Sequence, residues 1–257
     1  MKSIILKAKK AVYSSQIGLF QAPRSGEGYD FFDLEPYDFT SDAKRIHWPS
    51  YAKTRELYTK IFSKEERKNI LLLPILSGSL HFGSTRLKSE TLLEALAILA
   101  YSAFRYKEQL FIFDRQIKHI YELDLYLEKL ANTPLLGKTT TLNYLKNNTP
   151  HLTIVIGDFL EPLDLGFLAA RDDLVALIVR DTLETSQVIE ARANLVDTVS
   201  LSQKSANLAS SMPTYHEKIA MALAKELDRF RSLGVEWLEL FEYEDVFTKL
   251  ALFFRSR

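Results

Sequence analysis

The chain has 257 residues, of which 47% are hydrophobic, enough for one sizeable core with a small appendage. Its 33 basic and 33 acidic side chains balance, which argues against a nucleic-acid-binding protein and against electrostatic attraction to an anionic membrane. There is no cysteine, which excludes a disulfide framework, a thiolate metal site and a cysteine nucleophile, and fits a reducing compartment such as the cytoplasm.

The N-terminal quarter is predicted to form an extended arm. The apolar stretch near the N-terminus is too short for the core of a signal peptide. Between residues 11 and 66, Pro, Gly and Asp alternate with aromatic residues, which favours extended segments and loops over long helices. A charged hinge follows at residues 64–69. We therefore predict an N-terminal extended or β arm over residues 1–66 and an α/β domain over residues 67–257.

Beyond this hinge, apolar strands alternate with helices. Ile70–Leu76 is a continuous apolar run, typical of a central parallel strand covered on both faces. Thr214 and Glu217 form a capping-box pattern that predicts a helix start. Further strands are predicted at residues 109–113, 152–156, 174–179 and 235–241, and helices at 92–105, 121–130, 163–171, 214–233 and 246–254. This alternation predicts an α/β fold with a doubly wound, mostly parallel, Rossmann-like sheet and no membrane span.

Oxygen-bearing side chains follow the predicted strands. In doubly wound sheets, ligands bind at the carboxyl ends of the strands, near the point where the strand order reverses. Ser77, Ser79, Thr140 and Asp158 lie in loops that we expect at this edge, and hydroxyl and carboxylate oxygens are the ligands that Mg²⁺ prefers. The same residue types also cap helices and form turns, so an ordinary strand-to-helix turn remains open.

Two catalytic patterns are incomplete. Gly137-Lys138-Thr139 looks like the end of a phosphate-binding loop, but Asn132 stands where that motif needs a glycine, and a predicted helix precedes it. Ser79 and His81 lack the flanking glycines of a nucleophile elbow. One alternative function is a metal-dependent hydrolase or nucleotide-binding enzyme that uses Asp158 and the loop at residues 137–139. Another is a structural subunit whose cleft has no binding role.

A family resemblance is carried by five segments, of which residues 42–48 are the most specific: Gly26–Trp48, Leu71–Gly83, Gly137–Leu145, Gly157–Phe159 and Asp173–Glu184. They resemble the bacterial domain-of-unknown-function family 58, whose members contain a von Willebrand factor type A-like domain. The chain departs from the family pattern at Glu35, Ser41 and His47, where the family has Arg, Gly and Asp. The resemblance implies a type A-like α/β domain.

The resemblance also implies a metal-ion-dependent adhesion site formed by Ser77, Ser79, Thr140 and Asp158. The family's leading aspartate is replaced by Ile75, whose side chain cannot ligate a metal ion. We therefore expect a degenerate site that binds no metal, or binds Mg²⁺ weakly when a partner supplies a carboxylate. Because the family often occurs beside MoxR-type AAA+ ATPases, the resemblance implies a cytoplasmic protein-interaction module, an adaptor of such an ATPase, and not an enzyme.

Overall fold

The computed structural model divides the chain into two units. It describes residues 1–15, 19, 31–38, 43–62, 69–133, 151–161, 163–185, 192–196 and 203–257. One unit comprises Met1–Phe20 and Lys68–Arg257, and the other comprises Gln21–Arg67. The larger unit is an α/β domain, and the smaller one contains a two-stranded antiparallel sheet.

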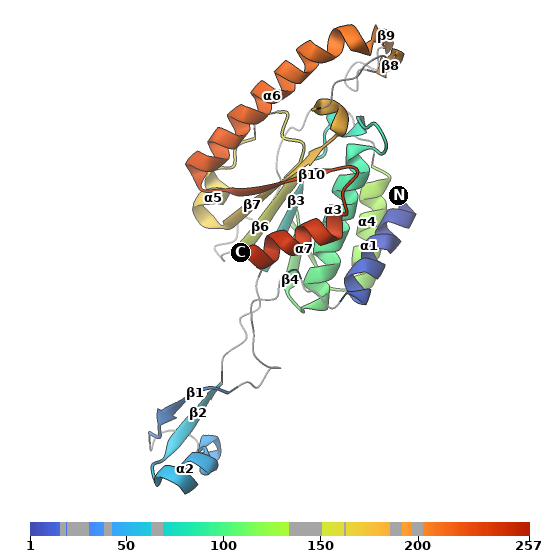
Figure 1. Cartoon of the computed structure of the whole chain (residues 1–257). Coiled ribbons are helices and arrows are strands. Elements are labelled where there is room, and N and C mark those ends of the chain that lie inside the picture. Colours follow the sequence, from blue (N-terminus) through green and yellow to red (C-terminus); the bar gives the residue numbers. More distant parts are fainter. Residues whose placement is uncertain are drawn as a thin grey trace. The chain divides into compact units, whose positions relative to one another are not determined.

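A six-stranded sheet forms the centre of the larger unit (Figure 1). Its strand order is β10-β7-β6-β3-β4-β5, and every neighbouring pair is parallel except the hairpin β4–β5. The first of these strands in the chain lies in the middle of the sheet, so the strand order reverses between β3 and β6, as in doubly wound folds. The strands are β3 (Asn69–Pro74), β4 (Gln109–Ile112), β5 (Arg115–Ile117), β6 (His151–Gly157), β7 (Asp173–Arg180) and β10 (Glu236–Phe241).

Helices cover both faces of this sheet (Figure 1). Alternate residues of each strand enter opposite cores: Ile70 and Leu72 of β3 pack in one cluster, whereas Leu71 and Leu73 pack in the other. Double cover explains why the strands read as continuous apolar runs. The larger core is formed with α1 (Lys2–Ser14), α3 (Lys88–Arg105), α4 (Ile120–Ala131) and α7 (Val246–Ser256), the smaller with α5 (Gly166–Arg171) and α6 (Leu208–Leu233). The predicted α/β fold class is confirmed.

The first 15 residues differ from the predicted extended arm. Residues 2–14 form helix α1, which packs against α3 and buries Ile5, Ala8 and Val12. The spacing of these three residues is that of one helix face, so the burial of this stripe stabilises the helix. Residues 1–20 therefore group with the α/β unit and not with the segment that follows them.

Helix α6 also begins earlier than its capping-box pattern predicts. It runs for 26 residues from Leu208 and includes Pro213, so Thr214 lies inside the helix and does not cap it. A two-stranded antiparallel sheet, β8 (Arg192–Val196) and β9 (Gln203–Asn207), comes directly before α6 and was not predicted. Figure 1 shows this hairpin at the N-terminal end of α6.

The small unit is built around the antiparallel pair β1 (Phe31–Pro36) and β2 (Tyr58–Phe62). Between these strands lie a short 3-10 turn, η1 (Ala43–Arg45), and helix α2 (Trp48–Thr54), and Ile46 bridges to Thr59 of β2. Short strands joined by turns agree with the pattern of aromatic residues and turn formers in this part of the sequence. Among the helices of the described residues, none is long and apolar enough to cross a membrane.

Candidate functional site

The carboxyl ends of four parallel strands carry a concentration of polar side chains. Asp158 directly follows β6, Asp181 follows β7, and Glu242 follows β10. Ser77 and Ser79 follow β3, which is hydrogen-bonded to β6 along its length. The strand order reverses between β3 and β6, so these side chains lie where a doubly wound sheet places its ligand site.

Ser77 and Ser79 are brought together by a short 3-10 turn, η2 (Gly78–His81). Their hydroxyl oxygens lie 2.7 Å apart, so one hydroxyl donates a hydrogen bond to the other. Ser77 is buried, whereas Ser79 is partly exposed. One hydrogen bond therefore joins the two hydroxyls that the sequence predicts as metal ligands.

Ile75 points into the smaller apolar core and not toward this turn. Its side chain is buried with Phe159 and Leu165, and its backbone N–H donates a 2.7 Å hydrogen bond to the carbonyl of Ile156. An ionised carboxylate at this position would lose its hydration in an apolar environment. The departure from the family pattern at this position is therefore consistent with the packing around it.

Two further parts of the predicted sites lie outside the described residues. Thr140, the fourth member of the predicted metal-binding set, falls within residues 134–150, and so does the loop Gly137-Lys138-Thr139. The described part of the set is Ser77, Ser79 and Asp158.

A buried ionic cluster surrounds Asp158, and sequence reasoning missed its central residue. The ammonium of Lys88, the first residue of α3, lies 3.0 Å from Asp158 Oδ2 and 2.9 Å from Glu184 Oε1. Arg180 binds the other oxygen of Glu184 through Nε at 2.7 Å. All four residues are buried, and Lys88 is 0% exposed. We call these four residues, Lys88, Asp158, Arg180 and Glu184, the ionic cluster.

Asp181 and Glu242 form a second acidic pair held by neutral donors. Asp181 accepts hydrogen bonds from the Ser84 N–H and hydroxyl and from the Leu183 N–H. Glu242 accepts from the Ser84 hydroxyl, from the Thr182 N–H at 3.0 Å and from the Thr182 hydroxyl. Through these hydrogen bonds, Ser84 in the loop between β3 and α3 contacts the residues that follow β7 and β10. The contacts hold this part of the loop in one position.

Aromatic side chains lie close to the ionic cluster. The rings of Phe82 and Tyr215 are 5.8 Å apart, and the Lys88 ammonium lies 5.8 Å from the centre of the Phe82 ring. Burial, together with the nearby carboxylates of Glu184, Asp158 and Asp181, raises the pKa of the Tyr215 hydroxyl well above its ordinary value of 10.0. Tyr215 and Phe82 are each partly exposed, so this ring pair can contact another molecule.

The described residues do not fit a bound dication. Asp158 is paired with a lysine ammonium, and the two serine hydroxyls bond to each other. Mg²⁺ requires several oxygen ligands in near-octahedral geometry. In the described part of the chain, no three His, Cys, Asp or Glu side chains converge in a way that could hold a metal ion.

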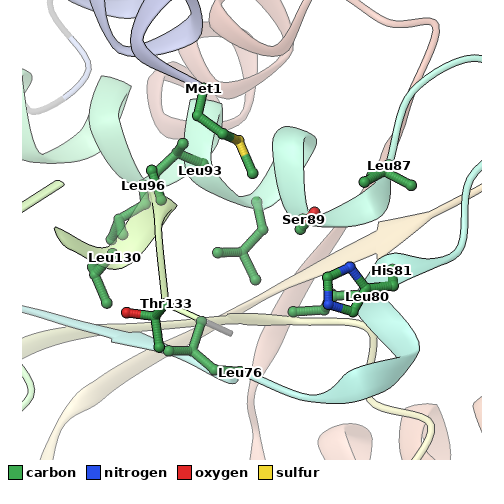
Figure 2. A pocket seen from close by; sticks show the side chains of 12 residues that line it. Met1, Leu76, Leu80, His81, Leu87, Ser89, Leu93, Leu96, Leu130 and Thr133 are labelled. Atoms are coloured by element: carbon green, nitrogen blue, oxygen red, sulfur yellow. The ribbon is translucent and has the colours of Figure 1, made fainter. Parts of the chain in front are cut away.

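A separate cavity is lined by residues of η2, α3 and α4 (Figure 2). It encloses about 540 Å³ of space, part of which is open solvent, and no member of the ionic cluster lines it. His81 lies on one side of it, whereas Leu130 and Thr133 lie on the other. The Ser89 hydroxyl is buried there without a hydrogen-bond partner among the described residues. The lining is mainly apolar, which distinguishes this cavity from the charged sheet edge.

One comparison with known proteins found a match. Residues 33–121 match the model of the family described as "Protein of unknown function DUF58". Over these residues the chain is similar to the DUF58 family. No curated protein and no solved structure gave a significant match.

The DUF58 match covers less than half of the 257 residues. It includes the segment at residues 42–48 and the strand and turn at residues 71–83, and therefore Ser77, Ser79 and Lys88. Asp158 and Glu184, the two carboxylates bound by Lys88, lie beyond the matched range. The DUF58 description names no activity, ligand or partner.

Proposed function

We propose that the chain is a cytoplasmic protein-interaction module, an adaptor of a MoxR-type AAA+ ATPase, that binds its partner at the carboxyl edge of the six-stranded sheet. The observation that carries this proposal is the partly exposed ring pair Phe82–Tyr215, which lies close to a buried ionic cluster at the point where the strand order reverses. The choice of partner rests on the family resemblance.

This surface has the features of a binding hot spot. Aromatic side chains contribute a large share of the binding energy at protein interfaces, because they bury much apolar area with few rotatable bonds. The loop that carries Phe82 is held by Ser84, whose N–H donates to Asp181 and whose hydroxyl bonds to Asp181 and Glu242. A loop that is already ordered loses little conformational entropy on binding.

Binding to a purified MoxR-type ATPase from the same organism tests this proposal. We expect Phe82→Ala and Tyr215→Ala each to weaken the affinity about tenfold or more, which corresponds to about 1.4 kcal/mol. Ser79→Ala should have a smaller effect. Tyr121→Ala is the matched control, because Tyr121 is an exposed aromatic residue of α4, away from the carboxyl ends of the strands.

The measurement is a titration by biolayer interferometry, with circular dichroism to establish that each variant is folded. Absence of binding by the unmodified chain would contradict the proposed partnership. Equal affinities for the unmodified chain, Phe82→Ala and Tyr215→Ala would show that the partner binds elsewhere on the molecule.

The enzyme hypothesis has less support from this geometry. It requires Asp158 as a metal ligand or base, but this carboxylate is buried and paired with Lys88. The experiment that separates the two hypotheses is a thermal-unfolding measurement with ATP and Mg²⁺. A ligand that binds only the folded chain at millimolar concentration raises Tm by mass action, and such a rise would favour the enzyme.

A further inference from the structure

We infer that the ammonium of Lys88 takes the place of a divalent cation at this sheet edge, so that the edge is metal-independent. The inference deepens the proposed function, because it specifies that the partner is bound without a metal bridge. The residues that carry it, which are residues 77–88, Asp158 and the end of β7, all lie in the part of the chain that the structure describes.

The geometry around the ammonium supports this assignment. Lys88 Nζ bridges one oxygen of Asp158, which follows β6, and one oxygen of Glu184, in the 3-10 turn η3 (Thr182–Glu184) that follows β7. Bridging carboxylates from neighbouring strand ends is what a metal ion does in a ligand site. The side chains of Lys88 and Glu184 are 0% exposed, and that of Asp158 is 4% exposed, so the bridge is excluded from water.

The charges of the ionic cluster are balanced without an additional ion. Lys88 and Arg180 supply two positive charges, and Asp158 and Glu184 supply two negative ones. Buried charges are tolerated when they are paired and hydrogen-bonded. A dication placed between the two carboxylates would face both cations at short range, and repulsion in this poorly solvated environment would be strong.

The lysine is also fixed in position by the backbone. Lys88 begins the 18-residue helix α3, and its backbone N–H donates a 2.9 Å hydrogen bond to the carbonyl of Phe82. The Phe82 ring lies 5.8 Å from the ammonium, within the range of a cation–π interaction. The same lysine therefore orders the loop and supports the aromatic ring to which we assign partner binding.

Mn²⁺ binding and thermal unfolding of the full chain, after treatment with EDTA, test the inference. We expect the unmodified chain to show no saturable Mn²⁺ binding by electron paramagnetic resonance. Its Tm should change by no more than about 1 °C between EDTA and about 10 mM MgCl₂. Saturable Mn²⁺ binding that is lost in Asp158→Asn or Ser79→Ala would overturn the inference.

The decisive variant is Lys88→Ala, which removes the ammonium and leaves space between the two carboxylates. We expect it to unfold at a lower temperature than the unmodified chain, and Mg²⁺ or Mn²⁺ to raise its Tm by several degrees. Asp158→Asn added to this variant should abolish the rise. Lys7→Ala is the control, because Lys7 also pairs with a buried carboxylate, that of Glu94, but is distant from the ionic cluster in the chain.

Lys88→Gln, which preserves most of the side-chain volume, replaces Lys88→Ala if the latter is not recovered in folded form. A folded Lys88 variant whose Tm is insensitive to divalent cations would contradict the inference.

A partner-binding measurement tests the inference separately from the proposed function. We expect the unmodified chain to bind its partner with equal affinity in EDTA and in MgCl₂. Binding that is lost in EDTA but present in MgCl₂ would contradict the inference that the edge is metal-independent, but not the proposed protein-interaction function. Absence of binding in both buffers would contradict only the proposed function.

Discussion

Ile75 packs so closely against Gly157 that a β-carbon built on the glycine would lie 2.8 Å from Ile75 Cβ. The end of β6 therefore has no space for a side chain next to the turn that follows β3. This close approach sets the spacing of the two strand ends that carry Ser77 and Asp158. The glycine has a packing role at this site.

Gly157→Ala is expected to destabilise the chain by about 1–3 kcal/mol, because Ile75 or the backbone of β6 must move to accommodate the methyl group. Gly166→Ala is the control, since the nearest atom to a β-carbon there is Asp164 Oδ1 at 3.4 Å. Unfolding in urea, followed by circular dichroism, measures both. Equal stabilities for the two variants would contradict the packing role of Gly157.

Ile5→Ala is expected to destabilise the α/β unit by about 2–5 kcal/mol, because it leaves a cavity in the apolar core beneath α1. Leu6→Ala, on the solvent side of the same helix, should change stability by less than about 0.5 kcal/mol. Chemical denaturation compares the two. Equal free energies of unfolding for Ile5→Ala and Leu6→Ala would contradict the packing of α1 against α3.

Thr153→Val is expected to cost about 1–3 kcal/mol, because the Thr153 hydroxyl donates a buried 2.6 Å hydrogen bond to Asp172. Arg171 also binds Asp172, but it cannot supply the donor that the valine removes. Thr133→Val is the control, because the Thr133 hydroxyl is exposed. A urea titration that found no difference between the two valine variants would refute the contribution of this hydrogen bond.

Glu226→Gln is expected to raise Tm at about pH 7 and to have no effect at about pH 3. Burial raises the pKa of Glu226 above its ordinary value of 4.5, and Arg229 offsets this only in part. The folded state therefore binds the proton more readily than the unfolded state. The stabilisation by the protonated carboxyl is complete below pH 4.5 and is lost as the pH rises through the raised pKa of Glu226 in the folded state.

Differential scanning fluorimetry across this pH range measures the effect of Glu226→Gln. Asp228→Asn is the control, because the Asp228 side chain is 74% exposed and pairs with Arg231 at the surface. An effect of Glu226→Gln that did not depend on pH would show that burial of the charge is not its cause.

The sheet could be predicted from the sequence because its signal is local. A strand covered on both faces must be apolar at every position, so Ile70–Leu76 and Leu174–Val179 are recognisable without knowledge of their neighbours. Helix α1 is harder to recognise, although Ile5, Ala8 and Val12 have helical spacing, because its apolar stripe is narrow and the aromatic-rich region that follows favours extended segments.

The ionic cluster could not be predicted from the sequence because its members are far apart in the chain. Lys88 lies 70 residues from Asp158 and 96 from Glu184. A lysine in the first turn of a helix is normally solvated, and nothing in its neighbours indicates burial. The family pattern includes Ser77, Ser79 and Asp158, whereas Lys88, which neutralises Asp158, lies outside that pattern.

The edges of the six-stranded sheet limit how another chain can join it. One edge is β5, which is only three residues long and carries Arg115 on its exposed side. The other edge is β10, where Glu236 pairs with Arg257 at the surface. Short edge strands and charged edge side chains oppose the addition of a further strand and so protect against aggregation. A strand of another chain is therefore not expected to add to the six-stranded sheet at β5 or β10.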